Sequence, residues 1–408
     1  MTTPEDGAAM QPRFARWLAT TNIVTRHIVA AYGPECINLS GGLPAPEIYP
    51  LQAIEAATRR ALARFKHRAV AYGPVEGMKE LRATIAARLS GPHQRFGVEN
   101  VLITNGSLQA LDLLGKILVE PGEPILAQFP TYLGALDAWR PRTPSYRALD
   151  WDAPPAALHD AVASAKFVYC VPNFSNPTGA LIATEARRRL LDAARSARGI
   201  LVEDDPYGAL FYDGPALPSL IELSGDGSEI YRGPVVHLGT LSKSIGPGLR
   251  IGWAVAEPAM IETLSLAKQG ADIGTGTFAQ AVAIELLDSG VDRATLPDML
   301  ALYRRRRDAL VAAAAEHLSL RFTFTKPVGG MFLWLTARDP GFDTDALWRT
   351  AFEGGVSFCP GSVFDPTARM KNAIRLNFTL NDEAKLAEGV RRLARAVERH
   401  LQAPAPTP

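Results

Sequence analysis

The chain has 408 residues, of which 47% are hydrophobic and 21% charged, as is usual for a folded globular protein. Its 43 basic and 42 acidic residues give no overall field that would attract nucleic acid or an anionic membrane. The three cysteines fit neither a disulfide framework nor a zinc cluster, which predicts a reducing, cytoplasmic location. We find neither a secretory signal nor a run of roughly 18 uncharged apolar residues that could span a membrane.

From about residue 100, short apolar runs alternate with helical patterns. The expected strands have these sequences: "NVLIT" (100–104), "PILAQF" (124–129), "KFVYCV" (166–171), "GILVED" (199–204), "VVHLG" (235–239) and "IGWAVA" (251–256). Most are apolar throughout, which is typical of strands that are covered on both faces. The alternation therefore predicts an α/β domain with a mostly parallel central sheet.

Beyond residue 298 the pattern changes to shorter strands between helices. A long helical stretch (296–318) precedes "GMFLWL" (330–335), "GVSFC" (355–359) and "AIRLNF" (373–378). This pattern predicts a smaller α+β domain that is joined to the first by the long helix. We expect an N-terminal segment at 1–45, a large domain at 46–298 and a small C-terminal domain at 299–408. The basic run Arg304 to Arg307 within the long helix is expected to be a solvated face.

A polar, glycine-rich turn interrupts two apolar strands in "VVHLGTLSKSIGPGLRIGWAVA" (235–256), and it carries Lys243. A single lysine is usually just solvated. At the mouth of a buried strand, however, desolvation lowers the pKa of a lysine, and its neutral amine can form a Schiff base with a carbonyl.

Three other stretches provide polar groups at the ends of predicted elements. "NFSNPTG" (173–179) follows one strand, and "LVEDDPYG" (201–208) ends another with acidic residues where α/β sheets bind ligands. In "ITNGSLQALDLL" (103–114), a serine hydroxyl and free backbone N–H groups lie at the N-terminus of a predicted helix, where an anion is favoured. A lysine for an aldehyde, a carboxylate for a ring nitrogen and a phosphate cradle together match pyridoxal phosphate.

In this order and spacing the motifs resemble the fold type I, class I/II aminotransferases. The similarity is greatest to the subgroup of 2-aminoadipate and kynurenine aminotransferases, and it extends from "INLSGGLPAPEIYP" (37–50) to "AIRLNF". The resemblance implies a ping-pong transfer of the amino group of an L-α-amino acid to a 2-oxo acid such as 2-oxoglutarate. It further implies a homodimer and a role in amino-acid metabolism or biosynthesis.

The resemblance also implies roles for individual residues. Lys243 would hold the cofactor covalently and move the proton, Asp204 would face the pyridine nitrogen, and Tyr207 would share the phenolate oxygen with Asn176. The residues that would stack on the cofactor or hold its phosphate are Tyr132, Ser107, Leu108, Thr240, Ser242 and Arg250, with Tyr72 reaching the site of the neighbouring subunit.

The substrate carboxylate is assigned by the resemblance to Arg375, with Asn176 and Gly42 beside it. Two positions depart from the pattern of the subgroup. Leu108 stands where a glutamine is usual, so that phosphate contact is left to the backbone N–H. Arg26, in "NIVTRHIVA" (22–30), is near but not clearly in register with a segment that gates the substrate side chain. Aromatic, aliphatic, aminoadipate-like and basic donors therefore stay open.

Other functions use similar residues. A lyase, decarboxylase or oxidase on the same fold would keep Lys243 and Asp204, and its independence of a 2-oxo acid would distinguish it. A transcription regulator fused to an aminotransferase-like domain needs a basic domain upstream, and about 40 residues precede "GGLPAP" here. The seven histidines show no metal-like spacing, and His237 is expected to be a packed residue near the site.

Overall fold

The computed structural model describes residues 13–20, 33, 35–92, 94–228 and 230–402. Its strands are β1 (Ile37–Asn38), β2 (Val101–Thr104), β3 (Pro124–Ala127), β4 (Ser145–Ala148), β5 (Phe167–Cys170), β6 (Leu201–Asp204), β7 (Val235–Thr240), β8 (Gly252–Val255), β9 (Phe322–Phe324), β10 (Phe332–Ala337), β11 (Val356–Ser357), β12 (Cys359–Pro360) and β13 (Ala373–Asn377).

The α-helices are α2 (Leu51–Phe65), α3 (Lys79–Leu89), α4 (Ser107–Leu118), α5 (Leu133–Trp139), α6 (Pro155–Ala163), α7 (Thr184–Ala197), α8 (Leu220–Leu223), α9 (Pro258–Asp272), α10 (Thr277–Asp288), α11 (Val291–His317), α12 (Thr344–Glu353) and α13 (Glu383–Gln402). Short 3₁₀ helices lie at Arg16–Thr20, Pro46–Ile48, Lys66–Ala69, Val98–Asn100, Arg140–Arg142, Pro247–Leu249 and Gly361–Phe364.

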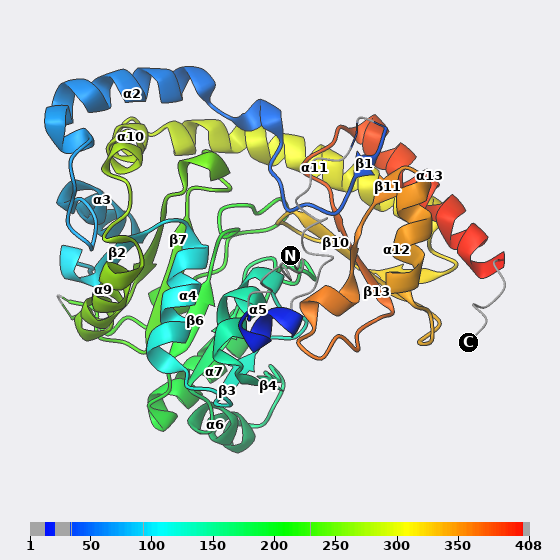
Figure 1. The fold of residues 1–408 in the computed structure, drawn as a ribbon, viewed down its shortest axis with the longest axis horizontal. Coiled ribbons are helices and arrows are strands. Elements are labelled where there is room, and N and C mark those ends of the chain that lie inside the picture. The colour runs from blue at the N-terminus through cyan, green and yellow to red at the C-terminus, as the bar shows by residue number, and fades with distance from the viewer. Residues whose placement is uncertain (1–12, 21–32, 34, 93, 229, 403–408) are drawn as a thin grey trace, which may run out of the picture.

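A seven-stranded sheet forms the centre of the larger part of the molecule (Figure 1), with the order β2-β8-β7-β6-β5-β3-β4. β8 is antiparallel to both of its neighbours, and the other neighbouring pairs are parallel. Alternate residues of one strand enter different hydrophobic clusters: Tyr169 belongs to one and Val168 to the other. The sheet is therefore covered on both faces, which explains its continuous apolar strands and confirms the predicted α/β class.

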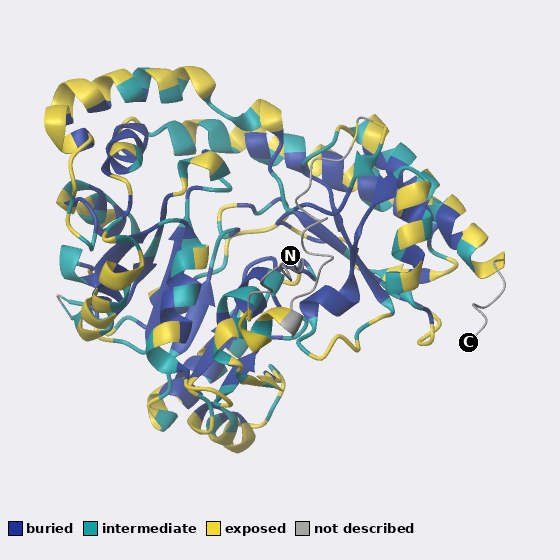
Figure 2. Ribbon diagram, in the orientation of Figure 1, coloured by how far each residue is buried: buried dark blue, intermediate teal, exposed yellow. Residues whose placement is uncertain are grey.

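The second sheet is antiparallel and has the order β12-β13-β10-β9. α11 runs from the larger part to this sheet, and α12 and α13 lie near it (Figure 1). β1 pairs in parallel with β11, so residues near the start of the described chain join the C-terminal part. The buried residues follow the sheets and the inner helix faces, as Figure 2 shows. The boundary predicted at residue 298 falls inside α11, and the three-part division stays a prediction.

The prediction for the basic run in α11 is wrong for half of it. Arg306 and Arg307 are buried, whereas their two neighbours follow the expected solvated face. Arg306 Nη1 donates to the Thr379 carbonyl at 2.7 Å, and Arg307 Nη1 donates to the Pro327 carbonyl at 3.0 Å. These loop carbonyls need donors once they are covered, and a long guanidinium side chain can reach them from the helix.

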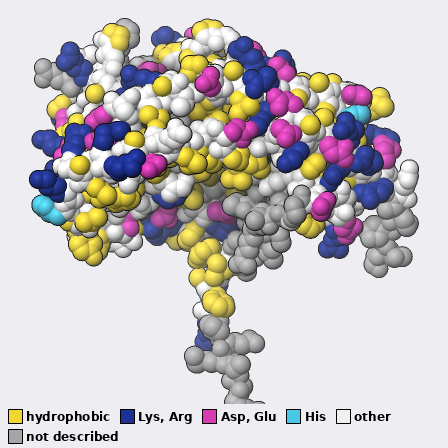
Figure 3. Space-filling view, turned by 90° about the horizontal axis from the view of Figure 1, so that it is seen from above, with side chains coloured by type: hydrophobic (Ala, Val, Ile, Leu, Met, Phe, Trp, Pro, Cys, Tyr) yellow, Lys and Arg dark blue, Asp and Glu magenta, His cyan; other side chains and the backbone are white. Residues whose placement is uncertain are grey.

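No helix within the described ranges is long and apolar enough to cross a bilayer. On the face shown in Figure 3, basic and acidic side chains are interspersed, which agrees with the nearly equal numbers of basic and acidic residues in the chain.

Candidate active site

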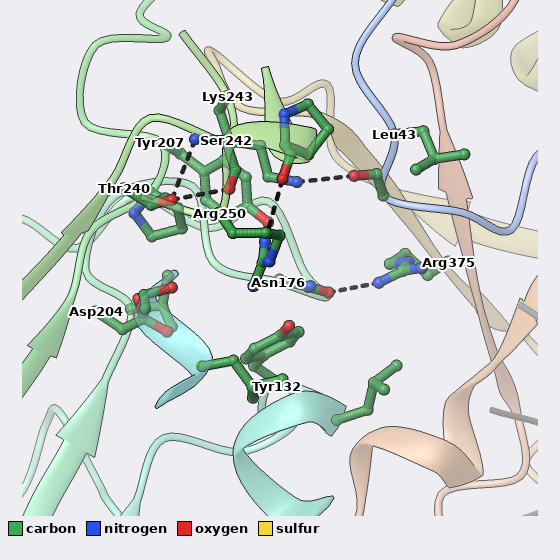
Figure 4. Close-up of a pocket in the computed structure, with 17 residues that line it drawn as sticks. Leu43, Tyr132, Asn176, Asp204, Tyr207, Thr240, Ser242, Lys243, Arg250 and Arg375 are labelled. Carbon is green, nitrogen blue, oxygen red and sulfur yellow. Dashed lines mark hydrogen bonds between the residues drawn. The ribbon is translucent and has the colours of Figure 1, made fainter. Parts of the chain in front are cut away.

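A pocket opens beside the carboxyl ends of β5, β6 and β7, where a parallel sheet is expected to bind its ligand. The close-up in Figure 4 shows residues from distant parts of the chain around this pocket. They are Gly42, Leu43, Ser107, Leu108, Tyr132, Leu133, Val171, Asn176, Asp204, Pro206, Tyr207, Thr240, Ser242, Lys243, Pro247, Arg250 and Arg375. The pocket thus brings together every predicted site residue within the described ranges except Tyr72.

Lys243 lies in the turn between β7 and β8, and its Nζ donates to the Gly42 carbonyl at 2.9 Å. Within the described part of the chain it has no ion-pair partner. Burial lowers the pKa of Lys243 to about 8, and the positive charges of Arg375 and Arg250 act in the same direction. A substantial fraction of this amine is therefore neutral near physiological pH, as a nucleophile requires.

Asp204 is the last residue of β6, and its Oδ2 accepts a hydrogen bond of 2.9 Å from the hydroxyl of Tyr169. Its Oδ1 is buried and has no hydrogen-bond partner among the described residues. Burial raises the pKa of this carboxyl to about 7. A buried oxygen without a partner, in a carboxyl that lines the pocket, fits the protonated ring nitrogen of pyridoxal phosphate.

The neighbours of Asp204 in sequence face elsewhere, because successive side chains of a strand point to opposite sides. Glu203 accepts hydrogen bonds from the backbone N–H groups of Leu220 and Ile221 at 2.6 and 3.1 Å. It also pairs with His237 Nδ1 at 3.0 Å, and both side chains are buried. His237 is thus a packed residue outside the pocket lining, as predicted.

The opposite end of the pocket is suited to a phosphate. Ser107 begins α4, whose first N–H groups are free of helical partners, and Gly106 before it has a φ of +77°. A Cβ added to Gly106 would lie 2.4 Å from Arg250 Nη2, so the close approach requires glycine. Thr240 Oγ1 donates to Ser242 Oγ at 2.8 Å on the adjoining side. The arrangement offers hydroxyls, N–H groups and a guanidinium to one anion.

Backbone carbonyls hold the arginine at this end. Arg250 Nη1 donates to the Pro247 carbonyl at 3.3 Å, and Nη2 donates to the Asn105 carbonyl at 3.1 Å. Leu108 lines the pocket with a partly exposed apolar side chain, so any polar contact at this position is left to its backbone. The next residue, Gln109, instead directs its amide to Asp272 outside the pocket.

Arg375 approaches the pocket from β13. Its Nη1 donates to Asn176 Oδ1 at 2.6 Å and its Nη2 to the Ser40 carbonyl, while its buried Nε has no hydrogen-bond partner among the described residues. The guanidinium lies over the rings of Phe332 and Phe364, at 4.3 and 4.9 Å from their centroids. A guanidinium that is fixed in position and still has an unpaired N–H donor is well suited to bind a carboxylate.

Two tyrosines complete the lining between these ends. Burial raises the pKa of Tyr207 well above its usual range, while a hydrogen bond with Asn176 opposes that shift. Burial likewise raises the pKa of Tyr132, the N-cap residue of α5, to about 12. Both hydroxyls therefore stay protonated near neutral pH and can donate hydrogen bonds.

Of the described residues that were predicted for the site, Tyr72 lies outside this pocket. The Tyr72 side chain is 93% exposed and lines a separate surface depression. Its predicted contact with a neighbouring subunit stays a prediction. Arg26 lies outside the described residues. Among the described residues there is no group of three or more His, Cys, Asp or Glu side chains that could hold a metal ion.

Comparison with known proteins identifies the family. The model for "Aminotransferase class I and II" matches residues 34–393. The chain belongs to the class I and II aminotransferases. It is 37% identical over 374 residues to the 2-aminoadipate transaminase of Thermus thermophilus, covering 90% of this chain and 91% of that protein. It is 35% identical over 382 residues to aromatic-amino-acid aminotransferase 1 of Thermococcus litoralis, covering 90% and 89%.

The fold of this aminotransferase agrees with that assignment. The crystal structure of the α-aminoadipate aminotransferase from Thermus thermophilus, complexed with N-(5'-phosphopyridoxyl)-L-leucine, is similar with a TM-score of 0.86 and 35% identity. The match covers 95% of this chain and 98% of that one. The protein is therefore a fold type I aminotransferase that uses pyridoxal phosphate and transfers an amino group between amino and oxo acids.

Proposed function

We propose that this aminotransferase works by a ping-pong cycle in which Lys243, Asp204 and Arg375 act on the donor and then on the 2-oxo acid. The observation that carries the proposal is a set of unused polar groups in one pocket. The Lys243 amine has no ion-pair partner in the described chain, and Asp204 Oδ1 and Arg375 Nε have no hydrogen-bond partner there. A buried polar group without a partner calls for an explanation, and a ligand in this pocket would provide one for these groups together.

When bound, pyridoxal phosphate supplies an aldehyde that receives the amino group and a ring that accepts electrons from the substrate Cα. Lys243 Nζ would hold the cofactor through its aldehyde carbon. In its neutral form, Nζ could take the proton from the substrate Cα and return it. Asp204 would face the protonated ring nitrogen, while Tyr207 and Asn176 would donate hydrogen bonds to the phenolate oxygen.

The two ends of the pocket orient these reacting atoms. Arg375 binds the α-carboxylate of the amino acid and then that of the oxo acid, with its position fixed by Asn176. Ser107, Thr240, Ser242 and Arg250 would bind the cofactor phosphate, and Tyr132 would pack against the cofactor ring. Positioning of this kind makes proton transfer effectively unimolecular, which is a large part of the rate enhancement.

The space left for the donor side chain supports an apolar donor. The pocket lining includes Gly42, Leu43, Leu133 and Pro247, none of which carries a charged side chain. Within the described ranges, each charged residue that lines the pocket already has one of the roles above. A charged donor side chain would therefore be desolvated there without a partner.

We further propose a homodimer in which Tyr72 reaches the cofactor phosphate of the neighbouring subunit. The support is its position: a tyrosine side chain that is almost fully exposed on a single chain gains from burial at an interface. A reducing, cytoplasmic location is part of the same proposal. It is supported by the free thiols of Cys36, Cys170 and Cys359.

The test is the absorption spectrum of the protein with pyridoxal phosphate, recorded separately with each of a panel of L-amino acids and no acceptor. Leucine or phenylalanine should bleach the yellow band, and a 2-oxo acid should restore it. Aspartate and lysine should bleach the band at least about tenfold more slowly. Release of carbon dioxide or ammonia in place of recovery by the oxo acid would contradict the proposal.

A further inference from the structure

A partly buried polar cluster lies directly behind the phosphate end of the pocket. Asp272, the last residue of α9, accepts hydrogen bonds at its Oδ2 from Asn105 Nδ2 and from Gln109 Nε2, both at 2.6 Å. Lys268 Nζ donates to both oxygens of Asp272 at 2.6 and 2.7 Å. The Lys268 side chain is fully buried. None of these four residues lines the pocket.

The cluster fixes Asn105 from several sides. Gln109 Oε1 accepts the backbone N–H of Asn105 at 2.8 Å, while the Asn105 side-chain amide is held by Asp272. The carbonyl of Asn105 in turn accepts the hydrogen bond from Arg250 Nη2. Asn105 immediately precedes the Gly106–Ser107 turn that opens the anion end. The carboxylate of Asp272 is therefore linked through Asn105 to Arg250. Through Gly106 and Ser107, which follow Asn105, it is also linked to the N-terminus of α4.

Asp272 is also the last residue of α9, and the chain that follows it runs to the segment that carries Tyr72. Ile273, directly after it, has a φ of +62°, and the chain then runs to Thr277. Thr277 Oγ1 donates to the Ala71 carbonyl at 2.8 Å, next to Tyr72. The segments that carry Ser107 and Tyr72, both proposed phosphate ligands, thus contact the end of α9 and the chain that directly follows it.

A cluster that served only stability would not need an ion pair that is hydrogen-bonded to side-chain amides. Burying an ion pair gives little net stability compared with apolar packing, so the pair by itself is weak evidence of a stabilising role. Polar groups behind a binding site, in contrast, commonly hold the groups that contact the ligand in a fixed orientation. Within the described ranges, the hydrogen bonds that Asp272 accepts from outside its own helix come from Asn105, which begins the turn at the anion end, and from Gln109, in the first turn of α4.

We propose that Asp272 is a positioning residue for the cofactor phosphate, acting through Asn105 and Gln109 on the 105–107 turn and on Arg250. This inference rests on the proposed role of that end of the pocket. It predicts that loss of the carboxylate weakens binding of ligands that carry the phosphate and leaves the remainder of the binding energy unchanged.

The experiment measures dissociation constants of the apoprotein for pyridoxal phosphate and for pyridoxal, which lacks the phosphate. Asp272→Ala should weaken binding of pyridoxal phosphate by about tenfold, the usual effect of losing a charge-assisted hydrogen bond, and pyridoxal binding by less than about twofold. The ³¹P NMR signal of the bound phosphate should also shift. The matched control is Asp112→Ala, because Asp112 forms the same kind of i,i+4 pair with Lys116 on α4, at 2.6 Å. It should leave both constants and the NMR signal unchanged.

A second variant covers the case in which Asp272→Ala does not fold. Gln109→Ala keeps the pair of Lys268 and Asp272 and should weaken binding of pyridoxal phosphate by about threefold, again without affecting pyridoxal. Equal weakening of both ligands, or no change in their ratio, would overturn the proposal for Asp272 while leaving the proposed function intact. A wild-type protein with no preference for pyridoxal phosphate over pyridoxal would overturn both, and would place the failure in the proposed phosphate end itself.

Discussion

Two lysines of this aminotransferase lie in contrasting surroundings. Lys268 is fully buried and meets both oxygens of Asp272, whereas Lys243 donates to a backbone carbonyl and has no described carboxylate partner. Burial lowers the pKa of both amines. Only in Lys268 does a carboxylate directly oppose that effect through a hydrogen bond.

The difference shows how one chain can use the same side chain for structure and for chemistry. A paired, buried ammonium is held in place and is a poor nucleophile, because both its proton and its position are fixed. An unpaired amine loses stability in the charged form and so becomes available for covalent work near neutral pH. Four measurements test this difference between the two lysines.

The largest effect is expected when the two lysines are removed in turn. Lys243→Ala should lower turnover by at least about 10⁴-fold, since it removes both the covalent link and the proton carrier. Borohydride reduction followed by peptide mass spectrometry should find the cofactor on Lys243 in the wild type and in Lys268→Met at saturating pyridoxal phosphate. Label on Lys268 would reverse the assignment.

A smaller loss is expected at the other cation of the pocket. Arg375→Ala should raise KM for both the amino acid and the oxo acid and lower kcat/KM by about 10²-fold, because a buried guanidinium–carboxylate pair is lost. Steady-state kinetics in both directions measure this effect. Arg321→Ala, which changes an exposed arginine, is the control. Unchanged KM values in Arg375→Ala would place the carboxylate site elsewhere.

Stability of the apoprotein should respond in the opposite sense. Lys268→Met leaves the carboxylate of Asp272 without its cation, and we expect it to lower the free energy of unfolding by about 2 kcal/mol. Lys243→Met removes an amine that has no charged partner and should change that free energy by less than about 0.5 kcal/mol, or raise it. Urea denaturation of the two apoproteins makes the comparison, and equal losses would remove the structural distinction.

The smallest effect is a pH dependence. Since the pKa of Lys243 is lowered to about 8, its neutral fraction rises about tenfold per pH unit below that value and levels off above it. The rate at which the apoprotein captures pyridoxal phosphate should follow that curve in stopped-flow absorbance. N-α-acetyl-lysine, with an ordinary amine pKa near about 10.4, is the reference and should continue to rise. A protein that follows the reference curve would show that the amine is not perturbed.

The strands that lead to the pocket could be predicted because they are buried on both faces and therefore carry unbroken apolar runs. The short strand β4 was not predicted: it lies at the edge of the sheet, and its residues are mostly exposed, so "SYRA" has no apolar pattern. The burial of Arg306 and Arg307 was not predicted for a related reason. The carbonyls that accept their hydrogen bonds lie in loops outside α11. The cluster at Asp272 left one weak signal, the i,i+4 spacing of Lys268 and Asp272 in "KQGAD".

The sequence by itself determined the class of fold, the family resemblance and the residue types of the site, since apolar periodicity and motif order are local properties. It could not decide which of Glu203, Asp204 and Asp205 lines the pocket without that resemblance, and in the structure Asp204 is the one of the three that does. Tertiary structure alone decided that Asp204 Oδ1 and Arg375 Nε lack partners in the described chain. It also decided that Lys268, and not Lys243, has a carboxylate. Lys243 donates to Gly42 and Arg375 to Asn176, about 200 residues away in each case, and no local pattern can encode such contacts.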